Sequence, residues 1–285
     1  MSATKQGEVE RQGGARFRKT IYLLPNLLTA ANMVLGILAI AYAINDSLNI
    51  SLASESKVVA FVWPARFILM AIFLDFMDGR VARATGTTSK FGMEFDSMSD
   101  LVSFGVAPAI LIYLSVLRYM SFWGICITVL YVVCVAVRLA RFNVQAMIEE
   151  KDHFMGLPSP AAAGLLASYV LLSRWDGWFT KGTVVKKLMS LYGENMNYVE
   201  SIAIPALTIL VALVMVSTIR YPSLKKWKTE TVKPWTLVMV VMVVFLVIYA
   251  AELTAFVLLT TYLFWGLIHL ITRKGTDRLR NRAAH

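Results

Sequence analysis

Eight apolar segments, each close to the length that crosses a lipid bilayer, restrict the folds open to this chain. A membrane-spanning helix needs roughly 20 predominantly apolar residues. The segments cover residues 21–45, 57–82, 97–117, 121–144, 158–174, 199–219, 234–251 and 253–272. Because backbone polar groups inside a bilayer must be satisfied within the protein, such segments form helices. We therefore predict an all-α bundle of about eight transmembrane helices.

The composition agrees with a membrane protein. Hydrophobic residues make up 58% of the chain and charged residues 16%, whereas soluble domains have about 45–50% and about 25%. The chain shows no sign of a separate soluble domain. We expect a single membrane domain with a short basic segment on either side, over residues 1–20, 21–272 and 273–285.

The distribution of basic residues predicts the orientation of the bundle. With eight spans and both termini in the cytoplasm, 21 of the 28 Lys and Arg residues lie on the cytoplasmic side, as the positive-inside rule requires. Seven spans would place the basic cluster at 273–282 outside. A net charge of +10 points to anionic membrane lipids rather than nucleic acid as partners. We predict a multi-pass protein of the cell membrane.

Four aspartates lie near the end of the second segment and the start of the third. Asp75 and Asp78 are three residues apart, and Asp96 and Asp100 are four apart, so each pair shares one face of a helix. Carboxylates brought together repel unless protons or cations compensate them, and ionisable residues at the bilayer are usually functional. Oxygen ligands suit Mg²⁺ or Mn²⁺. We predict a divalent-metal site; the alternative is an ion relay in a transporter.

Small residues accompany the aspartates. Gly79 and Ala82 share the helical face of Asp75 and Asp78, which allows a bulky ligand to approach the backbone. Gly92 is expected to turn the connecting loop before the next helix. The second aspartate pair would then lie within the first turn and a half of that helix, where the helix dipole favours negative charge.

The spacing Asp-Gly-x2-Ala-Arg-x8-Gly-x3-Asp-x3-Asp, from Asp78 to Asp100, resembles the signature of the CDP-alcohol phosphatidyltransferase family at every fixed position. Asp75 supplies the additional upstream aspartate. The resemblance implies six core transmembrane helices, usually in a homodimer, and displacement of CMP from a CDP-linked donor by a hydroxyl group. It also implies that the aspartates bind two divalent ions and that Asp100 is the general base, although Asp100 can equally be read as a fourth metal ligand.

The first apolar segment carries polar residues that need partners. Asn26 and Thr29 lie on the same side of an apolar helix, where they either bond to another helix or contact a ligand. The Pro-Asn-x-Leu-Thr opening resembles the first helix of the family, which implies nucleotide binding. By the same resemblance, the other residues of the nucleotide site would be Asp75, Gly79, Ala82, Arg83 and Gly92.

The acceptor site is predicted from three further segments. Arg138 and Arg141 lie at the end of the fourth span and precede Asn143; arginine there can bind a carboxylate or phosphate, or anchor the helix. RLARFN, GLPSPAAA and STIRYPS resemble the integral-membrane phosphatidylserine synthase branch of the family. This implies CDP-diacylglycerol as donor, L-serine as acceptor, and an acceptor site of Arg138, Arg141, Asn143 and Arg220. Glycerol 3-phosphate and an inositol phosphate are the alternative acceptors.

Overall fold

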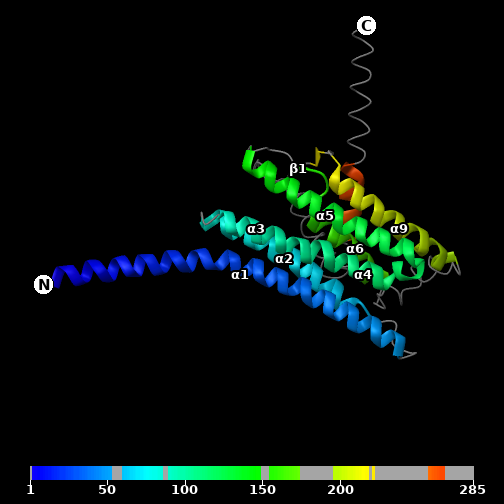
Figure 1. Ribbon diagram of the computed structural model, residues 1–285, viewed down its shortest axis with the longest axis horizontal. Coiled ribbons are helices and arrows are strands. Elements are labelled where there is room, and N and C mark those ends of the chain that lie inside the picture. Colours follow the sequence, from blue (N-terminus) through cyan, green and yellow to red (C-terminus); the bar gives the residue numbers. More distant parts are fainter. Residues whose placement is uncertain are drawn as a thin grey trace, which may run out of the picture.

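The chain folds as a bundle of long helices in the computed structural model, which describes residues 2–52, 60–85, 89–148, 154–173, 195–217, 220–221 and 256–266. The labelled α-helices are α1 (Ser2–Leu52), α2 (Val62–Thr85), α3 (Lys90–Asp100), α4 (Ala107–Ser115), α5 (Phe122–Ile148), α6 (Ser159–Ser173) and α9 (Asn195–Val216). A further short helix covers Phe256–Gly266. The N-terminal part of α1 projects from the bundle (Figure 1).

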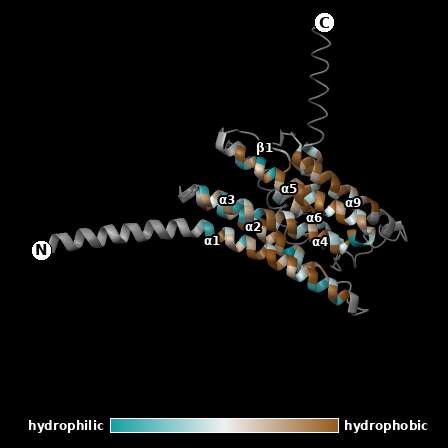
Figure 2. Ribbon diagram, in the orientation of Figure 1, coloured by the Kyte–Doolittle hydropathy of each residue, from teal (hydrophilic) through white to brown (hydrophobic). Residues whose placement is uncertain are grey.

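Among the described residues, three helical stretches are long and apolar enough to cross a membrane: Pro25–Ile50, Lys90–Ser115 and Phe122–Val144. Three shorter apolar helices accompany them, at Ser159–Ser173, Ile202–Val216 and Phe256–Gly266. Apolar residues dominate the helices of the bundle (Figure 2). The predicted all-α membrane bundle is confirmed. The predicted segment 234–251 lies outside the described residues.

The helix α3 begins earlier than the sequence pattern predicts. Ser89 is its N-cap, and the Ser89 side chain accepts a hydrogen bond of 2.9 Å from the Gly92 N–H. Gly92 therefore lies in the first turn of a helix, so its prediction as a loop glycine is wrong. Asp96 and Asp100 lie in the second half of α3. The dipole argument does not apply to them, because the dipole acts within the first turn.

A π-helix, η1 (Leu101–Val106), follows α3 directly and leads into α4. The Ala107 N–H donates to the Val102 carbonyl, five residues earlier. The Phe104 carbonyl accepts a hydrogen bond of 3.0 Å from the hydroxyl of Tyr131 in α5, a fully buried side chain. Short π-helical insertions are frequent next to functional sites. Here the insertion begins one residue after the last aspartate.

The helix α1 packs closely against η1. A Cβ atom added to Gly36 would lie 2.5 Å from Ser103 Oγ and 2.8 Å from Ser103 Cα, so only glycine permits this approach. The Ser99 and Ser103 hydroxyls donate to the Thr29 and Asn32 carbonyls of α1, each at 2.9 Å. Small residues and serine hydroxyls commonly join helices in membranes. These contacts fix α1 against the aspartate-bearing helix.

A two-residue antiparallel ladder joins the loops after α5 and α9, and the sequence pattern did not predict it. β1 (Phe154–Met155) pairs with β2 (Arg220–Tyr221). Gly156 follows β1 with φ +80°, and an added Cβ there would lie 2.2 Å from the Met215 carbonyl oxygen. The position therefore requires glycine. The ladder ties the GLPSP turn to the end of α9.

Candidate active site

Three carboxylates converge from two helices. Asp75 and Asp78 project from α2, and Asp96 projects from α3; one carboxylate oxygen of each lies within 4.8 Å of the others. Asp78 is buried, whereas Asp75 and Asp96 are partly buried. The i,i+3 spacing on α2 places its two aspartates on one face. The structure thus brings together three of the four predicted metal ligands.

This acidic triad fits a divalent cation. Its donors are all carboxylate oxygens, the ligand type that Mg²⁺ and Mn²⁺ prefer. Asp96 Oδ1 is buried and has no hydrogen-bond partner among the described residues. Buried charges are normally paired with an opposite charge or coordinate a metal. A cation would satisfy the orphaned oxygen and relieve the repulsion between the three carboxylates.

Asp100 lies beside the triad, at the end of α3, and is 8% exposed. Its Oδ1 accepts a hydrogen bond of 3.3 Å from the Asn32 Nδ2 of α1. Its carboxyl group is close enough to the Asp75 carboxyl group for the two to interact electrostatically. Arg138 of α5 is close enough to interact electrostatically with both Asp100 and Asp75. Asp100 therefore has a different environment from the other three aspartates.

The helix α1 lines the site with polar side chains. The Thr29 hydroxyl lies 3.0 Å from Asp78 Oδ2 and 3.1 Å from the Pro25 carbonyl oxygen. Asn32, which the sequence pattern did not single out, is fully buried and contacts Asp100. Its place could have been predicted from the sequence. Asn26, Thr29 and Asn32 recur every three residues and so follow one side of a helix.

The predicted nucleotide-binding residues lie at the same end of the bundle. A Cβ added to Gly92 would lie 3.3 Å from Asn26 Oδ1, so Asn26 packs against the first turn of α3. Gly79 follows Asp78 directly in α2. Ala82 and Arg83 continue that helix, and their side chains lie outside the described part of the structure.

The predicted acceptor residues separate into different environments. Arg138 Nη1 donates to Ser159 Oγ of α6 at 2.9 Å, and the guanidinium group lies near the aspartates. Arg141 Nη1 donates to the Val216 carbonyl of α9 at 3.1 Å. The Asn143 amide joins α5 to α3, because it accepts from Ser97 Oγ at 3.1 Å and donates to Glu94 at 3.4 Å. Arg220 lies in β2, and its side chain is outside the described part.

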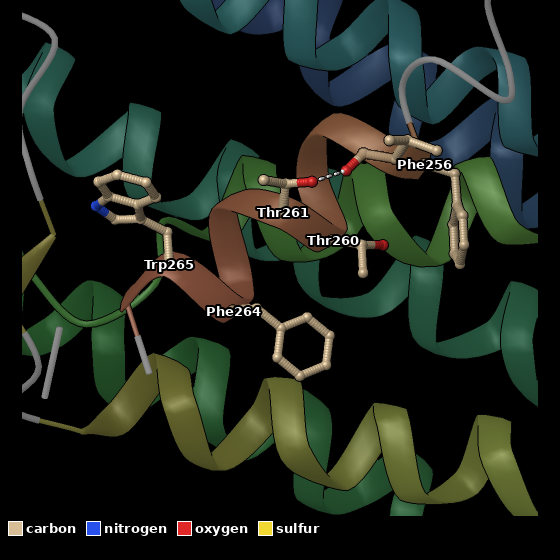
Figure 3. Close-up of a pocket in the computed structure, with 6 residues that line it drawn as sticks. Phe256, Thr260, Thr261, Phe264 and Trp265 are labelled. Atoms are coloured by element: carbon tan, nitrogen blue, oxygen red, sulfur yellow. Dashed lines mark hydrogen bonds between the residues drawn. The ribbon is translucent and has the colours of Figure 1, made fainter. Parts of the chain in front are cut away.

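A hollow lies on the short helix Phe256–Gly266, and its lining contains none of these residues. It has a volume of about 330 Å³ and is largely apolar (Figure 3). Its lining residues are Phe256, Val257, Thr260, Thr261, Phe264 and Trp265. The Thr261 hydroxyl is turned back onto the Val257 carbonyl at 2.7 Å. This hollow offers no carboxylate, imidazole or thiol for chemistry.

The chain is similar in sequence to a known protein family and to several named relatives. The sequence profile of the CDP-alcohol phosphatidyltransferase family matches residues 22–192. A CDP-diacylglycerol–serine O-phosphatidyltransferase of Helicobacter pylori is 36% identical over 251 residues, which are 87% of this chain and 91% of that protein. The Mycobacterium tuberculosis protein of the same name is 30% identical over 73% of this chain and 74% of its own length.

An archaeal relative extends the similarity. The archaetidylserine synthase of Methanothermobacter thermautotrophicus is 39% identical over 150 residues, which are 52% of this chain and 58% of that protein. The residues that match the family profile include all four aspartates, and also Thr29 and Asn32 of α1, which contact two of them. The chain therefore belongs to the CDP-alcohol phosphatidyltransferase family.

Proposed function

We propose that this protein transfers the phosphatidyl group of CDP-diacylglycerol to the hydroxyl group of L-serine, giving phosphatidylserine and CMP. The observation that carries the proposal is the convergence of three aspartates from α2 and α3, with the buried Asp100 beside them. It occurs in a chain that is similar over most of its length to proteins named as serine phosphatidyltransferases.

Asp100 is the proposed general base. It is buried, and its orientation is fixed by Asn32. In the proposed step, the serine hydroxyl gives its proton to the Asp100 carboxylate while its oxygen forms a bond to the phosphatidyl phosphorus. The bond from that phosphorus to CMP breaks, and the electron pair leaves with CMP. A positioned carboxylate is suited to such proton transfer, and phosphoryl-group transfer depends chiefly on positioning and charge stabilisation.

Asp75, Asp78 and Asp96 are the proposed principal holders of divalent cations, with Asp100 beside them. We propose Mg²⁺ or Mn²⁺, with two ions in the site. The chemistry that bound cations supply is neutralisation of the diphosphate charge and stabilisation of the departing CMP. The Thr29 hydroxyl orients Asp78, and such supporting hydrogen bonds typically tune metal affinity.

The remaining predicted residues would hold the donor. Asn26, Gly79, Ala82, Arg83 and Gly92 are the proposed contacts of the CDP group, while the acyl chains of CDP-diacylglycerol remain in the bilayer. The charge bias of the sequence supports a cytoplasmic orientation of both termini and the active site. L-serine would then enter from the cytoplasm. A homodimer is proposed from the family resemblance.

The proposal is tested by incubating the purified protein with CDP-diacylglycerol, either Mg²⁺ or Mn²⁺, and one acceptor at a time. The acceptors are L-serine, glycerol 3-phosphate, inositol and inositol 1-phosphate. We expect CMP release and a phosphatidylserine product with L-serine alone. If CMP is released with a phosphorylated acceptor but not with serine, the transferase activity stands and the proposed acceptor is wrong. Release with none of them would overturn the transferase assignment.

A further inference from the structure

Three buried side-chain atoms around the aspartates have no hydrogen-bond partner among the described residues: Asn32 Oδ1, Asp96 Oδ1 and Arg138 Nε. Buried polar groups in folded proteins are almost always satisfied, so each exception requires an explanation. The metal site accounts for Asp96 Oδ1. The other two atoms are one acceptor and one donor, and they belong to residues on different helices.

Asn32 contacts Asp100, and Arg138 lies near it. Asn32 donates to the Asp100 carboxylate at 3.3 Å from α1. Arg138 interacts electrostatically with the same carboxylate from α5. An unsatisfied acceptor and an unsatisfied donor are therefore present beside the proposed general base.

The orientation of the Asn32 amide follows from its neighbour. An ionised carboxylate only accepts hydrogen bonds, so the amide must present its NH₂ group to Asp100. Its carbonyl oxygen is then the orphaned atom, and it can be satisfied only by an N–H or O–H donor. Asn32 is 0% exposed, and none of the described residues supplies that donor.

The Arg138 guanidinium group has the complementary requirement. Its Nη1 donates to Ser159 Oγ at 2.9 Å, whereas its buried Nε–H has no acceptor within the part of the chain that the structure describes. Guanidinium N–H groups bind carboxylates in a fixed, directional geometry. Arg141, the other candidate from the sequence, donates to a backbone carbonyl of α9. The structure thus distinguishes two arginines that spacing left equivalent.

We propose that Asn32 and Arg138 recognise the two charged groups of an α-amino acid acceptor. The Asn32 amide oxygen accepts a hydrogen bond from the α-ammonium group, and Arg138 Nε–H donates to the α-carboxylate. The acceptor hydroxyl then lies at Asp100. This inference rests on the proposed transfer to L-serine and assigns Asn32 a role in specificity as well as in positioning the base.

The chemistry of serine fits this arrangement. Its hydroxyl and ammonium groups are on adjacent carbon atoms, so a hydroxyl held at Asp100 keeps the ammonium nearby. Because Asn32 contacts Asp100, its amide can serve both groups. Glycerol 3-phosphate lacks an ammonium group and would leave the amide oxygen without a cationic donor. Its phosphate would favour several convergent cationic groups.

The test compares Asn32→Ala and Arg138→Lys with two partial analogues of serine. 3-Hydroxypropanoate lacks the ammonium group, and ethanolamine lacks the carboxylate. For each enzyme we would measure the KM for L-serine and the Ki of each analogue as an inhibitor against L-serine. Asn45→Ala in α1 and Arg66→Lys in α2 are matched controls, because both side chains are exposed. The Tm and the KM for CDP-diacylglycerol report on folding.

Asn32→Ala is expected to raise the serine KM by about 10-fold to 100-fold, the worth of a hydrogen bond to a charged group. The Ki of 3-hydroxypropanoate should stay unchanged, because this analogue never contacts the amide oxygen. In Arg138→Lys the serine KM should rise while the Ki of ethanolamine stays unchanged. If Asn32→Ala does not fold, the same measurements are made on Asn32→Ser.

Equal losses for serine and 3-hydroxypropanoate in Asn32→Ala would overturn the ammonium contact and leave Asn32 only a positioning role. An unchanged serine KM would overturn it as well. Both results are distinct from failure of the proposed function, in which the wild-type protein itself releases no CMP with L-serine. In that case the inference falls together with the function on which it rests.

Discussion

The hydroxyl group of Thr29 in α1 lies 3.0 Å from Asp78 Oδ2 in α2, across 49 positions of sequence. It connects the first helix of the bundle to the acidic triad. Both residues are buried, with Thr29 5% and Asp78 4% exposed. A threonine that the family resemblance associates with nucleotide binding therefore also orients a proposed metal ligand.

Replacement of Thr29 by valine tests this role, because valine has a similar shape but no hydroxyl group. Loss of a hydrogen bond that supports a metal ligand typically weakens metal affinity by about 10-fold to 100-fold. We expect the Mg²⁺ or Mn²⁺ concentration for half-maximal CMP release to rise by that factor. The increase in Tm on adding the ion should shrink in parallel. Thr261→Val is the control, since Thr261 is exposed and its hydroxyl bonds within its own helix.

Asp100→Asn separates the general base from the metal ligands. The substitution preserves shape, and an amide oxygen can still accept the hydrogen bond from Asn32. We expect kcat to fall by about 100-fold to 10,000-fold, as for other general bases, with little change in the KM for CDP-diacylglycerol. Glu94→Gln, an exposed carboxylate on the same helix, should retain wild-type kcat. A transporter or an inactive lipid-binding scaffold would show no catalytic loss specific to Asp100.

Local periodicity predicted that each pair of aspartates shares a helix, and the structure places Asp75 and Asp78 on α2 and Asp96 and Asp100 on α3. The spacing of Asp75 and Asp78 fixes their common face, and Asp96 joins them because α2 and α3 both pack on α1. The all-α membrane class followed from apolar length alone. Both features depend on residues that are close in sequence, where side-chain directions are set by helical geometry.

The errors and omissions concern contacts that form only on folding. The Ser89 side chain caps α3 before Gly92. Gly92 therefore lies in the helix and not in the predicted loop. The β1–β2 ladder pairs residues on two distant loops. Asn32 was missed because its importance depends on the face that α1 presents to α3. Spacing within one helix cannot reveal which neighbour that face meets.

Gly36→Ala tests the close approach of α1 to η1. The new Cβ would meet Ser103 Oγ at 2.5 Å and Ser103 Cα at 2.8 Å, and a backbone atom cannot move aside cheaply. We expect a loss of about 1–3 kcal/mol in the free energy of unfolding in detergent, the usual penalty for overpacking. Gly164→Ala is the matched control, because its Cβ would meet only the ends of the Leu259 and Ile72 side chains, at 3.0 and 3.1 Å. Equal stability of the two variants would contradict the close approach.

Tyr131→Phe tests whether the π-helix supports the active site. The Tyr131 hydroxyl satisfies the Phe104 carbonyl of η1 at 3.0 Å, and the side chain is fully buried. Its removal leaves a buried acceptor without a partner, so we expect a loss of about 1–3 kcal/mol in unfolding free energy. Because η1 begins directly after Asp100, kcat should fall while the KM for CDP-diacylglycerol is retained. Tyr119→Phe, at an exposed position, serves as the control. Lower stability with unchanged kcat would make η1 a packing element that does not influence the position of Asp100.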